Sequence, residues 1–105
     1  MSIVFAAAAL ADLDQIEDDL RAVGPHVLLL FHERLARALS LRESFPLSAP
    51  EYQPPDPRLP GMRYFPIRRF NAYAVFYQPT ESGIRVVRVL HTSRNLAVLF
   101  TPDPP

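Results

Sequence analysis

The residues FPIRRFNAYAVFYQP at positions 65–79, followed by GIRVVRVLHTSRNL at 83–96, decide the fold of this chain. In both stretches, apolar and aromatic residues recur at about every second position, a spacing typical of β-strands. Residues that favour turns separate the apolar runs. We therefore expect an antiparallel meander with strands at 62–67, 72–77 and 84–91 and turns at 68–71 and 78–83.

Upstream of the meander, the apolar spacing becomes that of a helix. A short β-favouring run at 3–5 predicts a first strand, and the apolar residues of 6–23 then recur in steps of three and four. This stripe consists of Leu10, Leu13, Ile16 and Leu20, and the acidic residues between its members give the predicted helix an acidic outer face. Gly24-Pro25 ends the helix, because Gly tolerates the left-handed cap conformation and Pro cannot continue the hydrogen bonds.

A second helix is predicted at 26–42, again with an apolar stripe along one side. The stripe consists of Val27, Leu30, Phe31, Leu35, Ala38 and Leu39. Because the joint between the two helices is short, they should form an antiparallel hairpin whose apolar surface needs a sheet to cover it. The sequence therefore predicts an α+β fold in the order β-α-α-β-β-β, with the N-terminal helical hairpin packed on the sheet.

The segment 46–60 contains six prolines, which remove backbone donors and disfavour a helix. We expect an extended connector here, anchored to the body of the domain by Tyr52 and Leu59. A disordered linker is the alternative. Beyond the meander, we expect one helical turn or a last extended piece at 94–100, and a frayed tail at 101–105.

The charges of the chain cancel in number but not in position. The sequence has 11 arginines, no lysine and 11 acidic residues, so its formal net charge is zero. Residues 1–50 contain four arginines and seven acids, whereas residues 58–94 contain seven arginines and only Glu81. Positive charge is therefore concentrated on the meander and its flanks, where an acidic partner would be attracted.

The composition also excludes several classes of site. The chain has no cysteine, which rules out disulfide scaffolds, zinc ribbons and thiol nucleophiles and fits a reducing cytosol. His26 and His32 share no helix face at the spacing of metal ligands, so we expect no metal site and no cofactor. Asp12 and Asp14 interrupt the N-terminal apolar run, so neither a signal peptide nor a membrane helix is predicted. We expect a single cytoplasmic domain over 1–105.

Neither face of the predicted strand 84–91 is plainly polar. Regular alternation divides its residues into two sets, Val86, Arg88 and Leu90 on one face and Arg85, Val87, Val89 and His91 on the other. Two helices cover only one face of a sheet, so we expect the second face to bind a peptide, a protein or RNA. The alternative is that loops or the C-terminal segment cover it.

Several motifs together resemble the RelE/ParE toxin superfamily, closest to its ParE branch. They are the F-x-x-Y-x-V-F-Y strand at 70–77, the R-V-L-H-x-x-R run at 88–94, the P-G-M-R sequence at 60–63 and the helix entry F-A-x-x-A-L-x-D-L-x-x-I at 5–16. The resemblance covers about residues 3–20 and 60–100. It implies a β-α-α-β-β-β fold with a small, twisted, mainly antiparallel sheet.

The resemblance also implies a function and a partner. Such a chain is the toxin of a bacterial type II toxin–antitoxin pair, held in a hetero-oligomer by a small DNA-binding antitoxin whose acidic C-terminal segment wraps around it. Apolar residues of that segment would sit on the helical hairpin. The residues expected to contact the antitoxin or the target are Arg63, Arg68, Arg69, Arg85, Arg88, Arg94, Tyr73 and Tyr77. From the residues alone, the two tyrosines fit cross-strand packing better than base stacking, and Arg94 fits an internal anchor as well as a partner contact.

The superfamily contains two activities. RelE-like members cut mRNA on the ribosome, whereas ParE-like members poison DNA gyrase without an evident catalytic group. Metal-independent RNA cleavage would need a base, an acid and cations, for which His91, Arg63 and Arg94 are the candidates. The absence of lysine and the ending Phe100-Thr101-Pro102 differ from RelE-like nucleases and favour a non-enzymatic, gyrase-binding toxin. The alternatives are a ribosome-dependent nuclease and a non-toxic member that only binds its partner.

Overall fold

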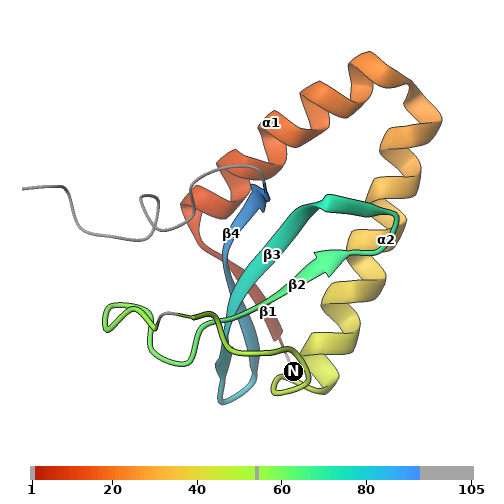
Figure 1. The fold of residues 1–105 in the computed structure, drawn as a ribbon. Coiled ribbons are helices and arrows are strands. Elements are labelled where there is room, and N and C mark those ends of the chain that lie inside the picture. The colour runs from red at the N-terminus through yellow and green to blue at the C-terminus, as the bar shows by residue number, and fades with distance from the viewer. Residues whose placement is uncertain (1, 54, 93–105) are drawn as a thin grey trace, which may run out of the picture.

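A computed structural model describes residues 2–53 and 55–92. The elements follow the predicted order and are β1 Ser2–Phe5, α1 Ala7–Val23, α2 Pro25–Ser44, β2 Arg63–Ile67, β3 Phe70–Thr80 and β4 Gly83–His91. Figure 1 shows the hairpin of α1 and α2 against one face of the sheet, which confirms the predicted α+β arrangement. The predictions for 94–100 and 101–105 lie outside the described residues.

The sheet is open and mixed, with the strand order β1-β4-β3-β2. β3 runs antiparallel to both of its neighbours, whereas β1 is parallel to β4. The parallel pair approaches closely where Gly83 lies opposite Ser2: a Cβ atom at position 83 would overlap the carbonyl oxygen of Ser2. Glycine is therefore required at this position for β1 to join the sheet.

β3 and β4 are longer, and the turns of the meander shorter, than the sequence predicts. Phe70 pairs with Ile67, so the first turn is Arg68-Arg69 alone. The second turn has only two residues as well, because Thr80 pairs with Gly83. The predicted turns at 68–71 and 78–83 were too long, since ladder pairing satisfies backbone groups that a longer loop would leave to water.

The buried stripe of α1 differs from the predicted stripe at one position. Ala9 is completely buried, together with Ile16 and Leu20, whereas Leu10 is 51% exposed. The prediction for Leu10 was wrong because the helical row through Ile16 and Leu20 continues to position 9, where a small side chain lets the helix approach the sheet. In α2, the buried residues Phe31, Leu35 and Leu39 all belong to the predicted stripe.

A β-bulge in β4 changes which residues share a face. The register with β3 shifts between 76 and 77, and Val87 is the extra residue on β4. As a result, Val86 and Leu90 lie in core clusters on opposite sides of the sheet, and so do Val87 and Val89. The predicted faces of this strand were wrong, because one inserted residue inverts the alternation that follows it.

Both faces of the sheet are buried. The helix-side cluster contains the buried residues of α1 and α2 and includes Phe65, Ile67, Val75, Tyr77, Ile84, Val86 and Val89 of the sheet. The second cluster consists of Met62, Ala74, Phe76, Val87 and Leu90. Tyr52 and Leu59 of the proline-rich connector pack on this second cluster, so they anchor the connector as predicted. The prediction of an open binding surface on the second face was therefore wrong, and the alternative of a loop covering it holds.

Candidate functional site

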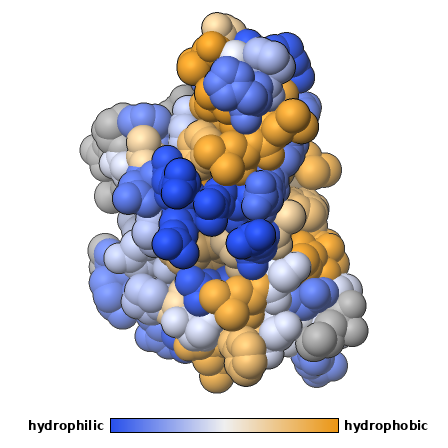
Figure 2. Space-filling model, turned by 90° about the vertical axis from the view of Figure 1, so that its right-hand side faces the viewer, coloured by the Kyte–Doolittle hydropathy of each residue, from blue (hydrophilic) through white to orange (hydrophobic). Residues whose placement is uncertain are grey.

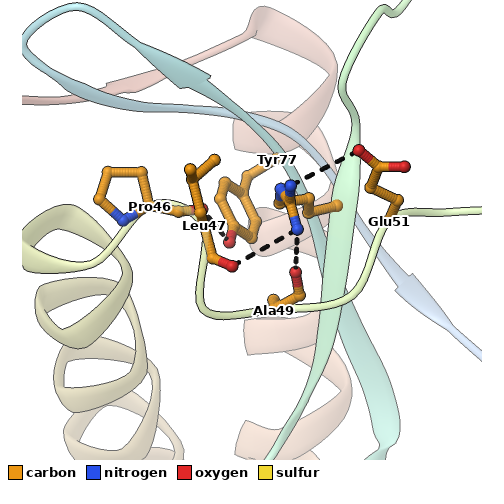
Figure 3. Close-up of polar contacts among 6 residues, drawn as sticks. Pro46, Leu47, Ala49, Glu51 and Tyr77 are labelled. Atoms are coloured by element: carbon orange, nitrogen blue, oxygen red, sulfur yellow. Dashed lines mark hydrogen bonds and ion pairs between the residues drawn. The ribbon is translucent and has the colours of Figure 1, made fainter.

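Arg63 is the first residue of β2, and its side chain holds the connector against this strand. Its Nη1 donates hydrogen bonds to the carbonyl oxygens of Ala49 at 2.6 Å and Leu47 at 3.4 Å, and its Nη2 lies 3.5 Å from Oε1 of Glu51. Figure 3 shows how the connector bends around this group beside Tyr77. Only 18% of the Arg63 side chain is exposed. The sequence predicted that the Arg63 guanidinium would contact a partner or take part in catalysis. In the structure, this guanidinium binds carbonyl oxygens of the connector.

Tyr77 lies directly beside this anchor and is completely buried. Its hydroxyl donates a hydrogen bond of 2.6 Å to the carbonyl oxygen of Pro46 (Figure 3). Burial, more than the opposing effect of nearby Arg42, raises the pKa of the phenol above its ordinary value of 10.0. Tyr77 is therefore part of the core rather than of a partner-binding surface, which corrects the prediction.

Arg88 is held by Asp12 of α1. Its Nε and Nη2 both donate to the Asp12 carboxylate, each at 2.8 Å, in the bidentate geometry that strengthens such pairs. The same carboxylate accepts a hydrogen bond of 3.0 Å from the backbone N–H of Val89. The side-chain hydrogen bonds with Asp12 raise the pKa of Arg88 above its ordinary value. Arg88 thus joins the sheet to α1, and its predicted contact with a partner stays a prediction.

Arg85 and Tyr73 also make internal contacts. Arg85 Nη1 donates a weak hydrogen bond of 3.4 Å to Gln78 Oε1. The half-buried ring of Tyr73 lies edge-on to Phe31, with its centroid 6.0 Å away, and edge-on to His91 at 5.2 Å. Tyr73 and His91 line a pocket of about 250 Å³ beside α1, so they keep a partly open surface.

Arg68 and Arg69 are the predicted contact residues that the structure leaves most accessible. Both are exposed at the turn between β2 and β3. Neither has a hydrogen-bond or ion-pair partner among residues 2–53 and 55–92. Arg69 also has a φ of 71°, a left-handed conformation that costs a non-glycine residue about 1 kcal/mol or more. Strained residues of this kind cluster at functional sites.

The structure does not bring His91 and Arg63 together. His91 pairs with Tyr73 and Arg63 pairs with Tyr77, so the two positions differ by four residues, or about 13 Å, along β3. They also lie on opposite sides of β3, and the Arg63 guanidinium is held by the connector. Arg94, the third candidate of the nuclease reading, lies outside the described residues. The two groups that are described form no joint catalytic site.

Two other properties of the described residues bear on function. Nowhere in 2–53 or 55–92 do three His, Cys, Asp or Glu side chains gather in an arrangement that could hold a metal ion. Over the same residues, no helix combines the length and the apolar character needed to cross a membrane.

A family model described as the ParE toxin of type II toxin–antitoxin systems, parDE, matches residues 3–96. This range runs from the first strand to beyond the last, and it includes every motif that carries the resemblance. The chain belongs to the ParE toxin family. No curated protein matches the chain significantly.

Among solved structures, the chain is similar to one titled "Chromosomal ParDE TA system from P. aeruginosa". The two chains are 22% identical, and the match covers 87% of this chain and 95% of the other, with a TM-score of 0.66. At this identity the likeness concerns the fold. It places the β-α-α-β-β-β order and the helical hairpin of this chain within the ParE fold.

In this member of the ParE family, sequence reasoning missed Asp12. Asp12 was counted with the acidic outer face of the first helix, although it lies four residues before Ile16 and eight before Leu20, on the buried row. That spacing is the signal that identifies it: a carboxylate on the inner row of a helix needs a cation from the sheet. Arg88 supplies that cation.

Proposed function

We propose that this chain is the toxin of a type II toxin–antitoxin pair and that it acts by binding DNA gyrase and blocking replication. The observation that carries the proposal is the match of the ParE toxin family model to residues 3–96. Gyrase is the target that the ParE branch implies, and a gyrase-directed toxin would act in the cytoplasm.

The geometry supports a binding toxin better than a nuclease. A metal-independent ribonuclease needs a base, an acid and a cation within reach of one phosphate. His91 and Arg63 lie apart on the sheet, and Arg63 already donates to the connector. No second candidate function is favoured by a contact among the described residues.

The turn Arg68-Arg69 is the proposed contact with the target. It places two adjacent, exposed arginines at the end of the β2–β3 hairpin, and neither is neutralised by an acid within the described part of the chain. Arginine is favoured at protein interfaces because its planar group makes several directed hydrogen bonds.

The proposed partner is a cognate antitoxin, a small DNA-binding protein whose acidic segment binds this chain in a hetero-oligomer. The similar solved structure belongs, by its title, to a ParDE system. The support within this chain is the excess of arginine over acid in residues 58–94 and several exposed apolar side chains on and after α2.

Induced expression in a bacterial host without the partner gene tests the proposal. We expect growth to stop, with incorporation of labelled thymidine falling before that of labelled methionine. The double variant Arg68→Ala/Arg69→Ala should relieve the block, whereas Arg21→Ala, an exposed arginine of α1, should not. Methionine incorporation falling first would instead indicate a ribosome-dependent nuclease, and unaffected growth would indicate a non-toxic member that only binds its partner.

A further inference from the structure

The two edges of the sheet are protected to different degrees. The connector pairs with the outer edge of β2: the N–H of Tyr52 donates to the carbonyl oxygen of Met62 at 2.9 Å, and the N–H of Tyr64 donates to that of Pro50 at 3.2 Å. Pro66 of β2 has no N–H to offer. β1, the other edge strand, pairs with β4 alone among the described residues. Its outer edge is therefore open.

The free backbone groups of β1 belong to Ile3 and Phe5. The N–H of Ser2 donates to the carbonyl oxygen of Ser82 at 2.7 Å, and that of Ala6 donates to Val86 at 2.9 Å, so these groups point toward β4. Because the direction of backbone groups alternates along a strand, those of Ile3 and Phe5 point away from β4. No backbone hydrogen bond outside the β1–β4 ladder involves either residue within the described part of the chain.

β1 and the start of α1 carry no charged side chain. The first charged residue of the chain is Asp12, and its carboxylate is bound to Arg88. Val4 of β1 is 52% exposed, and Leu10 of α1 is 51% exposed. The side of the molecule that bears α2 differs, because Figure 2 shows a band of hydrophilic side chains there, between two hydrophobic areas. Natural sheet edges are usually guarded by charges, prolines or bulges, so this unguarded apolar edge indicates a strand-pairing site.

The free groups of this edge are arranged symmetrically about Val4. In an antiparallel pair of two β1 strands, Ile3 of each copy lies opposite Phe5 of the other, and these residues exchange both of their N–H···O bonds. Val4 then lies opposite Val4 of the second copy, in a pair without mutual hydrogen bonds whose Cα atoms are about 4.5 Å apart. An edge that satisfies its own donors and acceptors in this way suits a two-fold symmetric dimer.

Electrostatics also favours the antiparallel arrangement. α1 begins at Ala6 without a side-chain cap and has no acidic residue in its first turn, so the positive end of its dipole is not compensated. Pairing of Ser2 with Gly83 places the exposed Glu81 at the start of β1. An antiparallel partner ends its own β1 at this same end of the sheet. The Glu81 carboxylate of each copy therefore lies on the side of the α1 N-terminus of the other, which is a complementary charge.

We infer that two copies of this chain associate through antiparallel pairing of their β1 strands, which joins their sheets into one continuous sheet. Each edge is four residues long, so the interface is smaller than the roughly 1,200–2,000 Å² of stable complexes, and the dimer is weak and reversible. β2 lies at the opposite edge, so the dimer leaves the Arg68-Arg69 turns of both copies accessible. The inference does not depend on the proposed function.

Cysteine cross-linking of the purified full chain tests the register, because the native sequence has no cysteine. In Val4→Cys, the two thiols lie within the Cα separation that a disulfide requires, about 4.4–6.8 Å. With oxidised glutathione as the oxidant, we expect the cross-linked dimer to form at least about tenfold faster than in Leu29→Cys, because pairing raises the effective concentration of the thiols. Leu29 is the matched control, since it is an apolar residue of α2 that is 71% exposed.

Sedimentation equilibrium measures the association itself. The native chain should show a monomer–dimer equilibrium in the high micromolar range. Val4→Glu should raise the dissociation constant at least about tenfold, because two carboxylates would meet at the two-fold axis. Leu29→Glu, the same change on α2, should alter it less than about threefold. Circular dichroism reports the fold of each variant.

Three results would overturn the inference: a native chain that stays monomeric throughout this range, equal cross-linking rates for Val4→Cys and Leu29→Cys, or self-association that survives in Val4→Glu and disappears at about 0.5 M salt. The last result would indicate that the acidic face of α1 binds the basic side of a second copy instead. These assays contain neither gyrase nor cells, so their failure leaves the toxin proposal standing. A failed toxicity test likewise leaves a measured dimer standing.

Discussion

Asp12 joins α1 to β4 at the point where β1 stops pairing with β4. The last pair of β1 is Phe5 with Val86, and beyond it the Asp12 carboxylate accepts from the Val89 N–H and from Arg88. The Asp12 side chain thus accepts a backbone hydrogen bond from β4 beyond the end of β1, and it neutralises the half-buried Arg88 guanidinium. A sequence pattern can place Asp12 on the inner row of its helix, but the partner 76 residues away follows only from the fold.

Substitution Asp12→Ala should lower the free energy of unfolding by about 2–3 kcal/mol, because Arg88 and the Val89 N–H lose their acceptor in a site where the carboxylate is only 13% exposed. Urea denaturation measures the change. Asp18→Ala is the matched control, since its ion pair with Arg21 is exposed and should contribute less than about 0.5 kcal/mol. Equal losses in the two variants would contradict the structural role of Asp12.

Tyr77→Phe should affect stability in a pH-dependent manner. Below pH 10 the phenol is protonated in both states, so the loss is that of one hydrogen bond, about 1 kcal/mol. Above pH 10 the unfolded state ionises first, because the pKa of Tyr77 is raised in the folded state, and native stability falls with pH. Because Tyr77→Phe has no phenol at this position, it should lack the part of the stability loss above pH 10 that Tyr77 causes.

Urea titrations between pH 7 and pH 11 measure that difference. Tyr73→Phe is the control, because Tyr73 packs on the same face but its hydroxyl has no hydrogen bond among the described residues. If the native chain and Tyr77→Phe lose stability in parallel above pH 10, burial of the phenol is not the cause.

At the scale of elements, the order and type of helices and strands follow from local sequence patterns. The division of residues between the two sheet faces and the lengths of the turns do not. The periods of 6–23, 26–42 and the meander are strong enough to define each element. The bulge at Val87 leaves no signature in the spacing of apolar residues, since every residue of 86–90 except Arg88 is apolar. Residues Arg68-Arg69 form the whole first turn because pairing of Ile67 with Phe70 outweighs the local preference for a longer loop.

The contact of β1 with β4 gives a prediction for one glycine. Gly83→Ala should displace β1 and cost at least about 2–3 kcal/mol, because the new Cβ would overlap the Ser2 carbonyl oxygen and backbone must move. Gly61→Ala is the comparison: its φ of 71° disfavours alanine, but no atom lies within 4 Å of the added carbon, so the cost should be about 1 kcal/mol. Thermal unfolding of the two variants compares them, and a smaller loss for Gly83→Ala would contradict the register.

At the scale of the molecule, the net charge of zero conceals a basic side. The acids of the first half do not all face away from the arginines of the second, since Asp12 neutralises Arg88. Glu51 and Asp56 likewise pair with Arg63 and Arg58. On α2, Glu33 pairs with Arg37, so what remains without an acid on this side of the molecule, among the described residues, is Arg34 and Arg42 with the Arg68-Arg69 turn. The sequence predicted the excess of positive charge on the meander and its flanks, but it could not show which of these arginines are paired within the fold.

The supercoiling assay with purified DNA gyrase tests the central claim most directly, since it contains only the enzyme, ATP, relaxed plasmid and this chain. We predict that the native chain blocks supercoiling, that Arg68→Ala/Arg69→Ala is weaker by about tenfold, and that Arg21→Ala matches the native chain. Unimpaired supercoiling in the presence of folded chain, together with cleavage of ribosome-bound mRNA by the same preparation, would contradict the claim.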